Sequence, residues 1–156
     1  MNKENIFIRE AEEKDIPEII SMIKELAKYE KLLHKVKISE ENVKNVAFGN
    51  NKFVEILIAE FQQKVCGQVI FFKNFSTFVG KPGYYIEDLY VKPDYRGKGI
   101  GKTLLNEVIK RAKEKNFGRV EWAVLDWNVS AIEFYKNRGA FPLNEWIIFR
   151  LEEDKF

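Results

Sequence analysis

Residues 91–102, VKPDYRGKGIGK, carry the pattern that decides the fold. A strand-like run ends at Val91, a turn follows, and glycines alternate at positions 97, 99 and 101 as an apolar helical pattern begins. The first N–H groups of a helix have no partner within the helix and carry partial positive charge. The glycines let the backbone approach an anion, and Arg96 and Lys98 add positive charge. The stretch therefore predicts a phosphate-binding turn between a strand and a helix; a plain glycine-rich turn before an amphipathic helix stays open as the alternative.

Outward from this turn, the sequence predicts an ordered series of strands and helices. Apolar runs bounded by turn residues predict strands at 6–9, 53–61, 64–72, 84–91, 119–125 and 146–151. Helical spacing and the N-caps Asp15, Ser39 and Asn128 predict helices over 15–30, 39–49, 100–112 and 128–136. The order β-α-α-β-β-β-α-β-α-β predicts an α+β fold with a mixed, mostly antiparallel central sheet flanked by helices. The strands on either side of the long helix should be parallel neighbours.

The composition excludes several classes of protein. Basic and acidic residues number 26 and 24, which argues against a nucleic-acid or membrane-surface partner. We expect a cytoplasmic protein of one domain over residues 1–156, because the sequence shows no linker, no apolar signal segment and no membrane-spanning run. One His and one Cys cannot build a four-ligand zinc site, so no metal is expected. Cys66 should be a buried small hydrophobe and His34 a solvated loop residue.

Two nucleotide-binding motifs compete for the glycine turn. The dinucleotide fingerprint requires a glycine where the chain has Lys102. Gly101-Lys102-Thr103 matches the second half of a Walker motif, but Arg96 stands where its first glycine should be. A P-loop also usually follows the first strand of a parallel sheet, and four strands precede this turn. A P-loop nucleotide-binding protein stays open as an alternative.

Combined motifs along essentially the whole chain resemble the GNAT superfamily of N-acetyltransferases. The Arg-x-x-Gly-x-Gly pattern at 96, 99 and 101 resembles its acetyl-CoA signature. The resemblance extends to Ile8-Arg9-x-Ala11 with Asp15, and to Trp127-Asn128 before Phe134-Tyr135 and Arg138-Gly139-Ala140. Residues 23–30 (IKELAKYE), Glu87-Asp88, Asp94-Tyr95-Arg96-Gly97 and Asn128 with Phe134-Tyr135-Lys136 are similar to spermidine/spermine (diamine) and thialysine N-acetyltransferases in particular.

This resemblance implies acetyl-CoA as co-substrate and assigns residues to it. The pyrophosphate would lie on the turn formed by Arg96, Gly97, Lys98, Gly99, Ile100, Gly101 and Lys102. The pantetheine arm would pair like an added strand with Leu89, Tyr90 and Val91, and Asn128 and Ala131 would line its other side. Such pairing requires the strand ending at Val91 to splay from the next one. Tyr135 resembles the general acid that protonates the departing thiolate; without the resemblance, an aromatic residue on this helix face would be read as a core residue.

The acceptor is expected to be a primary amine of a small molecule. An amine of pKa ~10 must lose a proton before attack, and Glu87 resembles the residue that accepts it. By resemblance, Tyr29, Glu30, Glu87 and Glu145 bind the amine. A polyamine or diamine is the first expectation. Three lysines within residues 31–37 would repel a long polycation, so a thialysine- or lysine-like amino acid is the alternative. The resemblance also favours a homodimer. A protein that binds acetyl-CoA as an interaction module, without transfer, stays open.

Overall fold

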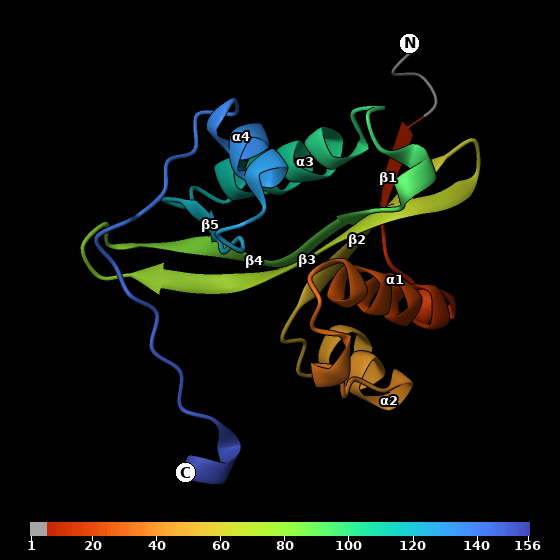
Figure 1. The fold of residues 1–156 in the computed structure, drawn as a ribbon, viewed down its shortest axis with the longest axis horizontal. Helices are drawn as coiled ribbons and strands as arrows, with labels where there is room; N and C mark the ends of the chain where they lie inside the picture. The colour runs from red at the N-terminus through yellow and green to blue at the C-terminus, as the bar shows by residue number, and fades with distance from the viewer. Residues whose placement is uncertain (1–5) are drawn as a thin grey trace. The chain divides into compact units, whose positions relative to one another are not determined.

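Five strands form one sheet in the order β1-β2-β3-β4-β5 (Figure 1). The structure is a computed structural model that describes residues 6–156; the expectation about an N-terminal signal segment concerns residues 1–5 and lies outside that range. Neighbouring strands are antiparallel, except that β4 and β5 are parallel. The predicted mixed, mostly antiparallel sheet is confirmed. Its strands are β1 (Ile6–Glu10), β2 (Glu55–Phe61), β3 (Lys64–Ser76), β4 (Lys81–Val91) and β5 (Val120–Trp122).

The chain divides into two units, Met1–Ala123 and Val124–Phe156, and the sheet belongs to the first. That residues 1–156 form a single domain therefore remains a prediction. The described residues of the first unit form three α-helices, α1 (Ile16–Tyr29), α2 (Glu40–Val43), which a π-helical turn (Lys44–Phe48) extends, and α3 (Ile100–Glu114). It also has short 3₁₀ turns at Glu13–Asp15, Leu33–Lys35 and Pro93–Tyr95. None of the helices in the described part of the chain is long and apolar enough to span a membrane.

The helices of the first unit cover both faces of the sheet. Figure 1 shows α1 and α2 on one face and α3 on the other. On the α1 face, a cluster of buried apolar residues joins the two helices to β2, β3 and β4. On the α3 face, the predicted apolar stripe of α3 is buried except for Ile109, which is 41% exposed. Burying apolar surface on both faces makes the sheet the common core of the two layers.

The β2–β3 connection is a two-residue hairpin, as the sequence predicts. Gln62 and Gln63 have φ angles of 51° and 64°. Positive φ at both central residues is the geometry of a type I′ turn, whose twist matches that of the flanking strands. The turn therefore fixes the antiparallel register of β2 and β3 without a glycine.

A β-bulge interrupts β4 at Glu87. Asp88 stands opposite Ile70 of β3, but the next pair along the ladder joins Ile86 to Phe71, so Glu87 is the extra residue. A bulge bends its strand and reverses the side-chain alternation beyond it. The pairing of β4 with β5 also ends at Ile86. β4 therefore runs from Glu87 to Val91 without pairing to β5, which is the separation of the two strands that the sequence predicts.

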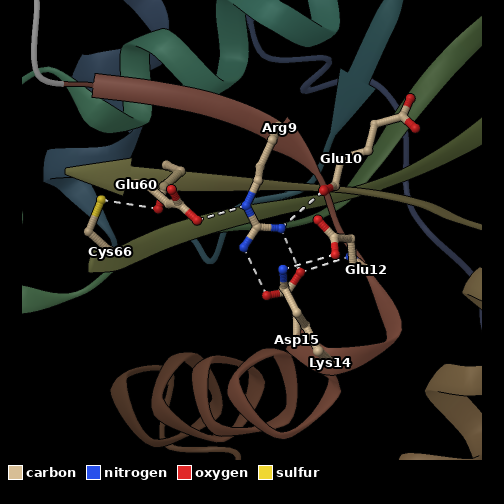
Figure 2. A network of polar contacts seen from close by, with 8 residues as sticks. Arg9, Glu10, Glu12, Lys14, Asp15, Glu60 and Cys66 are labelled. Carbon is tan, nitrogen blue, oxygen red and sulfur yellow. Dashed lines mark hydrogen bonds and ion pairs between the residues drawn. The ribbon is translucent and has the colours of Figure 1, made fainter. Parts of the chain in front are cut away.

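Arg9 ties the end of β1 to the start of α1 (Figure 2). Its guanidinium donates to both carboxylate oxygens of Asp15, at 2.6 and 2.9 Å, and to Glu60 at 2.7 Å. The sequence predicts that Asp15 caps α1, but its side chain makes no cap hydrogen bond to that helix. It accepts instead from the backbone N–H of Glu12, at 2.8 Å. The hydrogen bond from Arg9 is the main cause that lowers the pKa of Asp15, so the buried carboxylate stays ionised.

The second unit contains α4 (Val129–Lys136), a 3₁₀ turn (Glu153–Lys155) and no strand among its residues, all of which are described. The predicted strand over residues 146–151 is therefore wrong in this structure. A strand requires a hydrogen-bonded neighbour, and this run has none, so its apolar side chains are exposed, Phe149 to 91%. β5 is likewise shorter than predicted, because only three of its residues pair with β4. The predicted order of elements is confirmed from β1 to α4.

Candidate active site

The turn before α3 has the geometry of an anion-binding site. Gly97 and Gly99 have φ angles of 75° and 82°, a region that favours glycine, and a Cβ added at either position would meet no atom within 4 Å. Gly99 is the N-cap of α3, and no side chain caps the helix. The amide of Thr103 is the first to bond back, to the carbonyl of Gly99 at 3.0 Å. The preceding amides of the first turn are therefore available to a pyrophosphate, and the residues fit that group.

The two cationic side chains of the turn are held by the protein itself. Arg96 Nε donates to the carbonyl of Val91 at 2.9 Å. Lys98 Nζ donates to the carbonyl of Asp94 at 3.1 Å and lies 5.3 Å from the ring centroids of both Phe61 and Tyr95. Both charges stay near the turn, but neither side chain extends freely from it. Direct contact with an anion would fall mainly to backbone amides.

The free edge of β4 can accept an added strand. The amide of Lys92 donates to Cys66 of β3, at 2.9 Å. Since hydrogen bonding alternates along an antiparallel ladder, the backbone groups of Tyr90 also face β3, whereas those of Leu89 and Val91 face the opposite edge. β5 does not pair there, and the carbonyl of Val91 already accepts from Arg96. Leu89 and the amide of Val91 therefore offer the hydrogen bonds for a pantetheine arm, and Tyr90 does not.

Carboxylates from α1 and β4 gather where the bulge occurs. Burial first, and then the charges of Glu87 and Glu30, raise the pKa of Asp88 to about 6. Burial also raises the pKa of Glu30, the C-cap residue of α1. Two of the expected amine-binding residues, Glu30 and Glu87, thus lie close enough to act on Asp88. Asp88 is partly buried, whereas Glu87 is exposed.

Tyr29 contacts the glycine turn before α3. Its ring lies under the guanidinium of Arg96, with 5.3 Å from the ring centroid to Cζ. The ring of Tyr90 lies 5.6 Å from the same carbon, and its hydroxyl donates to Glu25 of α1 at 2.8 Å. A residue expected in the amine site therefore contacts one expected in the cofactor site.

The other predicted site residues belong to the second unit. The Asn128 side chain accepts from the amide of Ala131 at 3.3 Å and so caps α4 as predicted. Tyr135 lies on this helix, is partly buried and packs edge-on against Phe134, with 5.3 Å between ring centroids. Glu145 lies in an exposed turn of the C-terminal segment. The structure therefore brings Asn128 and Ala131 together.

The remaining candidate features, Cys66, His34, metal-binding groups and a pocket, add no catalytic group to the site. Cys66 is buried, its thiol donates to the carbonyl of Ala59, and burial raises its pKa to about 11, so it is not a nucleophile. His34 is exposed, as predicted. Within residues 6–156, no group of His, Cys, Asp and Glu could hold a metal ion. A pocket of about 680 Å³ lies by the start of β2, but its Arg111 is already paired with Glu10 and Glu55.

Comparison with known proteins identifies the family. Residues 19–140 match the model of the acetyltransferase (GNAT) family, and the chain belongs to that family. It is 43% identical to a thialysine N-epsilon-acetyltransferase of Sus scrofa over 95% of this chain and 93% of that protein. It is 33% identical to the spermidine/spermine N(1)-acetyltransferase-like protein 1 of Homo sapiens over 95% of this chain but 23% of that protein.

A solved structure has a similar fold. The fold matches an integron cassette protein from the mobile metagenome of V. cholerae with a TM-score of 0.79 and 25% identity, over 97% of this chain and 94% of that one. The protein is an N-acetyltransferase of a family that uses acetyl-CoA, with relatives that act on amines. The P-loop alternative is therefore wrong, as the antiparallel sheet before the turn also indicates.

Proposed function

We propose that this enzyme transfers the acetyl group of acetyl-CoA to the side-chain amine of a lysine-like amino acid such as thialysine. The observation that carries the proposal is the position of Asp88 with Glu30 and Glu87 at the bulge of β4, on the strand whose free edge leads to the phosphate-binding turn. A cationic amine is the ligand that a group of carboxylates attracts. The relative with 43% identity is a thialysine N-epsilon-acetyltransferase, which supports this acceptor.

Charges after α1 favour an amino acid over a polyamine. Lys35 and Lys37 are exposed, and within residues 6–156 the structure pairs neither with a carboxylate. An amino acid carries a carboxylate that a lysine can bind, whereas a polyamine carries only cations. A polyamine or diamine is the second candidate, because Glu30, Glu87 and Asp88 could neutralise more than one ammonium group. The similarity to a spermidine/spermine acetyltransferase-like protein supports it.

Acetyl-CoA would be held by the backbone rather than by side-chain cations. The amides of Gly97, Lys98, Gly99, Ile100, Gly101 and Lys102 would hold the pyrophosphate, with Arg96 nearby. Leu89 and the amide of Val91 would bond the pantetheine arm, and Asn128 and Ala131 would line it. Bound acetyl-CoA supplies the acetyl group as a thioester. An outward N–H of β4 would donate to the carbonyl oxygen as negative charge develops on it.

Three protons must move during the transfer. Asp88, with a pKa near 6, is ionised at neutral pH and can accept the proton of the substrate ammonium, directly or through water. Glu87 and Glu30 would then hold the cation before it reacts. The free amine forms the new C–N bond as the C–S bond breaks, and Tyr135 would give a proton to the departing sulfur. The second proton of the attacking nitrogen would pass to the tyrosinate, directly or through water, so the step ends with a neutral amide, a free thiol, a neutral Tyr135 and a protonated Asp88 that returns its proton to solvent.

Calorimetry and an amine panel test this function. Acetyl-CoA should bind the pure protein, and thialysine should release free CoA faster than spermidine does. Faster release with spermidine would select the polyamine candidate instead. Acetyl-CoA binding without CoA release on any amine of the panel would indicate an interaction module. No binding of acetyl-CoA would remove the proposal.

We also propose a cytoplasmic homodimer without nucleic-acid or membrane partners. The near balance of 26 basic and 24 acidic residues argues against those partners. The exposed apolar segment around Ile147 and Phe149, 79% and 91% exposed, supports a second copy as its cover. Sedimentation as a monomer at micromolar concentration would contradict the dimer.

A further inference from the structure

Arg96 joins the phosphate-binding turn to the C-terminal end of α1. Its Nε donates to the carbonyl of Val91, and its Cζ lies 5.3 and 5.6 Å from the ring centroids of Tyr29 and Tyr90. Both rings attract the guanidinium, because the face of an aromatic ring is electrostatically negative. A single side chain of the turn therefore contacts β4 and the last residue of α1.

One side of this contact is fixed by the core. Tyr90 is 4% exposed, and its hydroxyl donates to Glu25 of α1 at 2.8 Å. Burial and this hydrogen bond raise the pKa of Tyr90 to about 12, so the hydroxyl stays a donor. Tyr29, on the other side, is 42% exposed. The position of Arg96 can therefore affect Tyr29 more readily than Tyr90.

The end of α1 links Tyr29 to the acceptor carboxylates. The helix closes with a hydrogen bond from the amide of Leu32 to the carbonyl of Ala27, at 2.7 Å, and Lys31 has a φ angle of 62°. This is the pattern of a Schellman motif, which fixes the path of the chain at a helix end. Glu30 lies between Tyr29 and Lys31, and its charge acts on Asp88. A change in the position of Tyr29 therefore also changes the position of Glu30.

We propose that the contact between Arg96 and Tyr29 couples the two substrate sites, so that coenzyme A on the turn raises the affinity for the amine. The inference rests on the proposed function. Coenzyme A on the amides beside Arg96 would favour the arrangement in which the guanidinium stays between Val91 and Tyr29. That arrangement holds Glu30 toward Asp88. Linkage then requires the amine to raise the affinity for coenzyme A by the same factor.

The test measures the Kd of thialysine by calorimetry, without coenzyme A and with saturating coenzyme A, which has no acetyl group to transfer. In the wild type, coenzyme A should tighten thialysine binding about fivefold or more. Tyr29→Leu should bring this ratio close to one, because leucine offers no ring face. Tyr29→Phe keeps the ring and should keep the ratio. Phe78→Leu is the matched control, at a 97% exposed position on the β3–β4 hairpin, and should also keep it.

The ratio separates coupling from simple contact. If Tyr29 only touched the amine, Tyr29→Leu would weaken thialysine binding equally with and without coenzyme A, and the unchanged ratio would overturn the proposal. A wild-type ratio of one would overturn it too, while acetyl transfer by the same protein would leave the proposed function standing. Failure of the wild type to bind coenzyme A would overturn both. If only spermidine binds, it replaces thialysine as the probe, with the same expected ratios.

Discussion

Tyr84 and Tyr90 lie six residues apart on β4, yet they face opposite sides of the sheet. Tyr84 packs against Phe117, which follows α3, with 4.8 Å between ring centroids. Tyr90 belongs to the buried cluster on the α1 face and bonds to Glu25. In a regular strand an even separation puts two side chains on one face. The bulge at Glu87 reverses the alternation between them, and it turns Asp88 toward the α1 side, where Glu30 lies.

Asp88→Asn should lower kcat/KM for the amine by about a hundredfold or more at pH 8, because the substrate ammonium loses its proton acceptor. In the wild type, kcat/KM should rise as the pH passes about 6, where Asp88 loses its proton. This rise should be missing in Asp88→Asn. The check is a pH profile of steady-state kcat/KM for both proteins.

Glu87→Gln is the matched comparison for that profile. Removing the charge of Glu87 removes one cause of the raised pKa of Asp88, so the rise should move to lower pH and persist. Loss of the rise in Glu87→Gln and its survival in Asp88→Asn would make Glu87 the proton acceptor instead, as the sequence predicts.

Asp88→Asn should also stabilise the fold above pH 6. The folded-state pKa of Asp88 is raised from 3.8 to about 6, so ionisation of this group lowers the free energy of unfolding. The stabilising effect of the protonated form is fully present below pH 4 and is lost as the pH rises from 4 to 6. Asparagine does not ionise, and the gain at pH 8 should be about 1–3 kcal/mol. Thermal melts at pH 4 and pH 8 measure it. An equal effect of the substitution at both pH values would contradict the burial of an ionised Asp88.

Gly99→Ala should weaken acetyl-CoA binding beyond its effect on stability. At φ 82° an alanine is strained by about 1–2 kcal/mol and would reshape the turn that presents the α3 amides. Gly80→Ala is a matched control, because Gly80 has a φ of 70° and equally open surroundings but lies on the β3–β4 hairpin. Both variants should lose similar thermal stability, whereas calorimetry should show weaker acetyl-CoA binding only for Gly99→Ala. Equal affinity in both would remove the turn from the cofactor site.

Tyr135→Phe should reduce turnover by about 10–100-fold and leave acetyl-CoA affinity nearly intact, because only the acidic proton is lost. Steady-state kinetics and calorimetry on the same preparation separate the two effects. Unchanged turnover would assign Tyr135 to the packing of α4 against Phe134.

Arg9→Leu should destabilise the first unit by about 3–5 kcal/mol, because it leaves the buried carboxylate of Asp15 without its cation. The contribution of this pair exists above the unfolded pKa of Asp15 and is lost as the pH falls through its lowered folded pKa. The loss should therefore be largest near neutral pH, by denaturant unfolding. Lys14→Ala, which removes an exposed pair with Glu12, should cost about 1 kcal/mol or less. Equal costs for the two variants would show that Arg9 adds no more than a surface pair.

The sequence determined the order of elements from β1 to α4 and the location of the glycine turn before α3. These features depend on local patterns: the apolar spacing of α3, the N-cap at Asn128, and the glycines at 97 and 99 that a left-handed turn requires. Each pattern acts within a few residues, so it can be read without knowledge of the rest of the fold.

Only the tertiary structure decided which face of the sheet Asp88 lies on and which groups the Arg96 guanidinium contacts. It alone also decided that residues 146–151 form no strand. Each outcome depends on a partner far away in the sequence: the β3 register at Ile70, the ring of Tyr29, and a neighbouring strand. The pairing of distant segments follows from the packing of the whole chain, whereas helix spacing and turn chemistry follow from neighbouring residues.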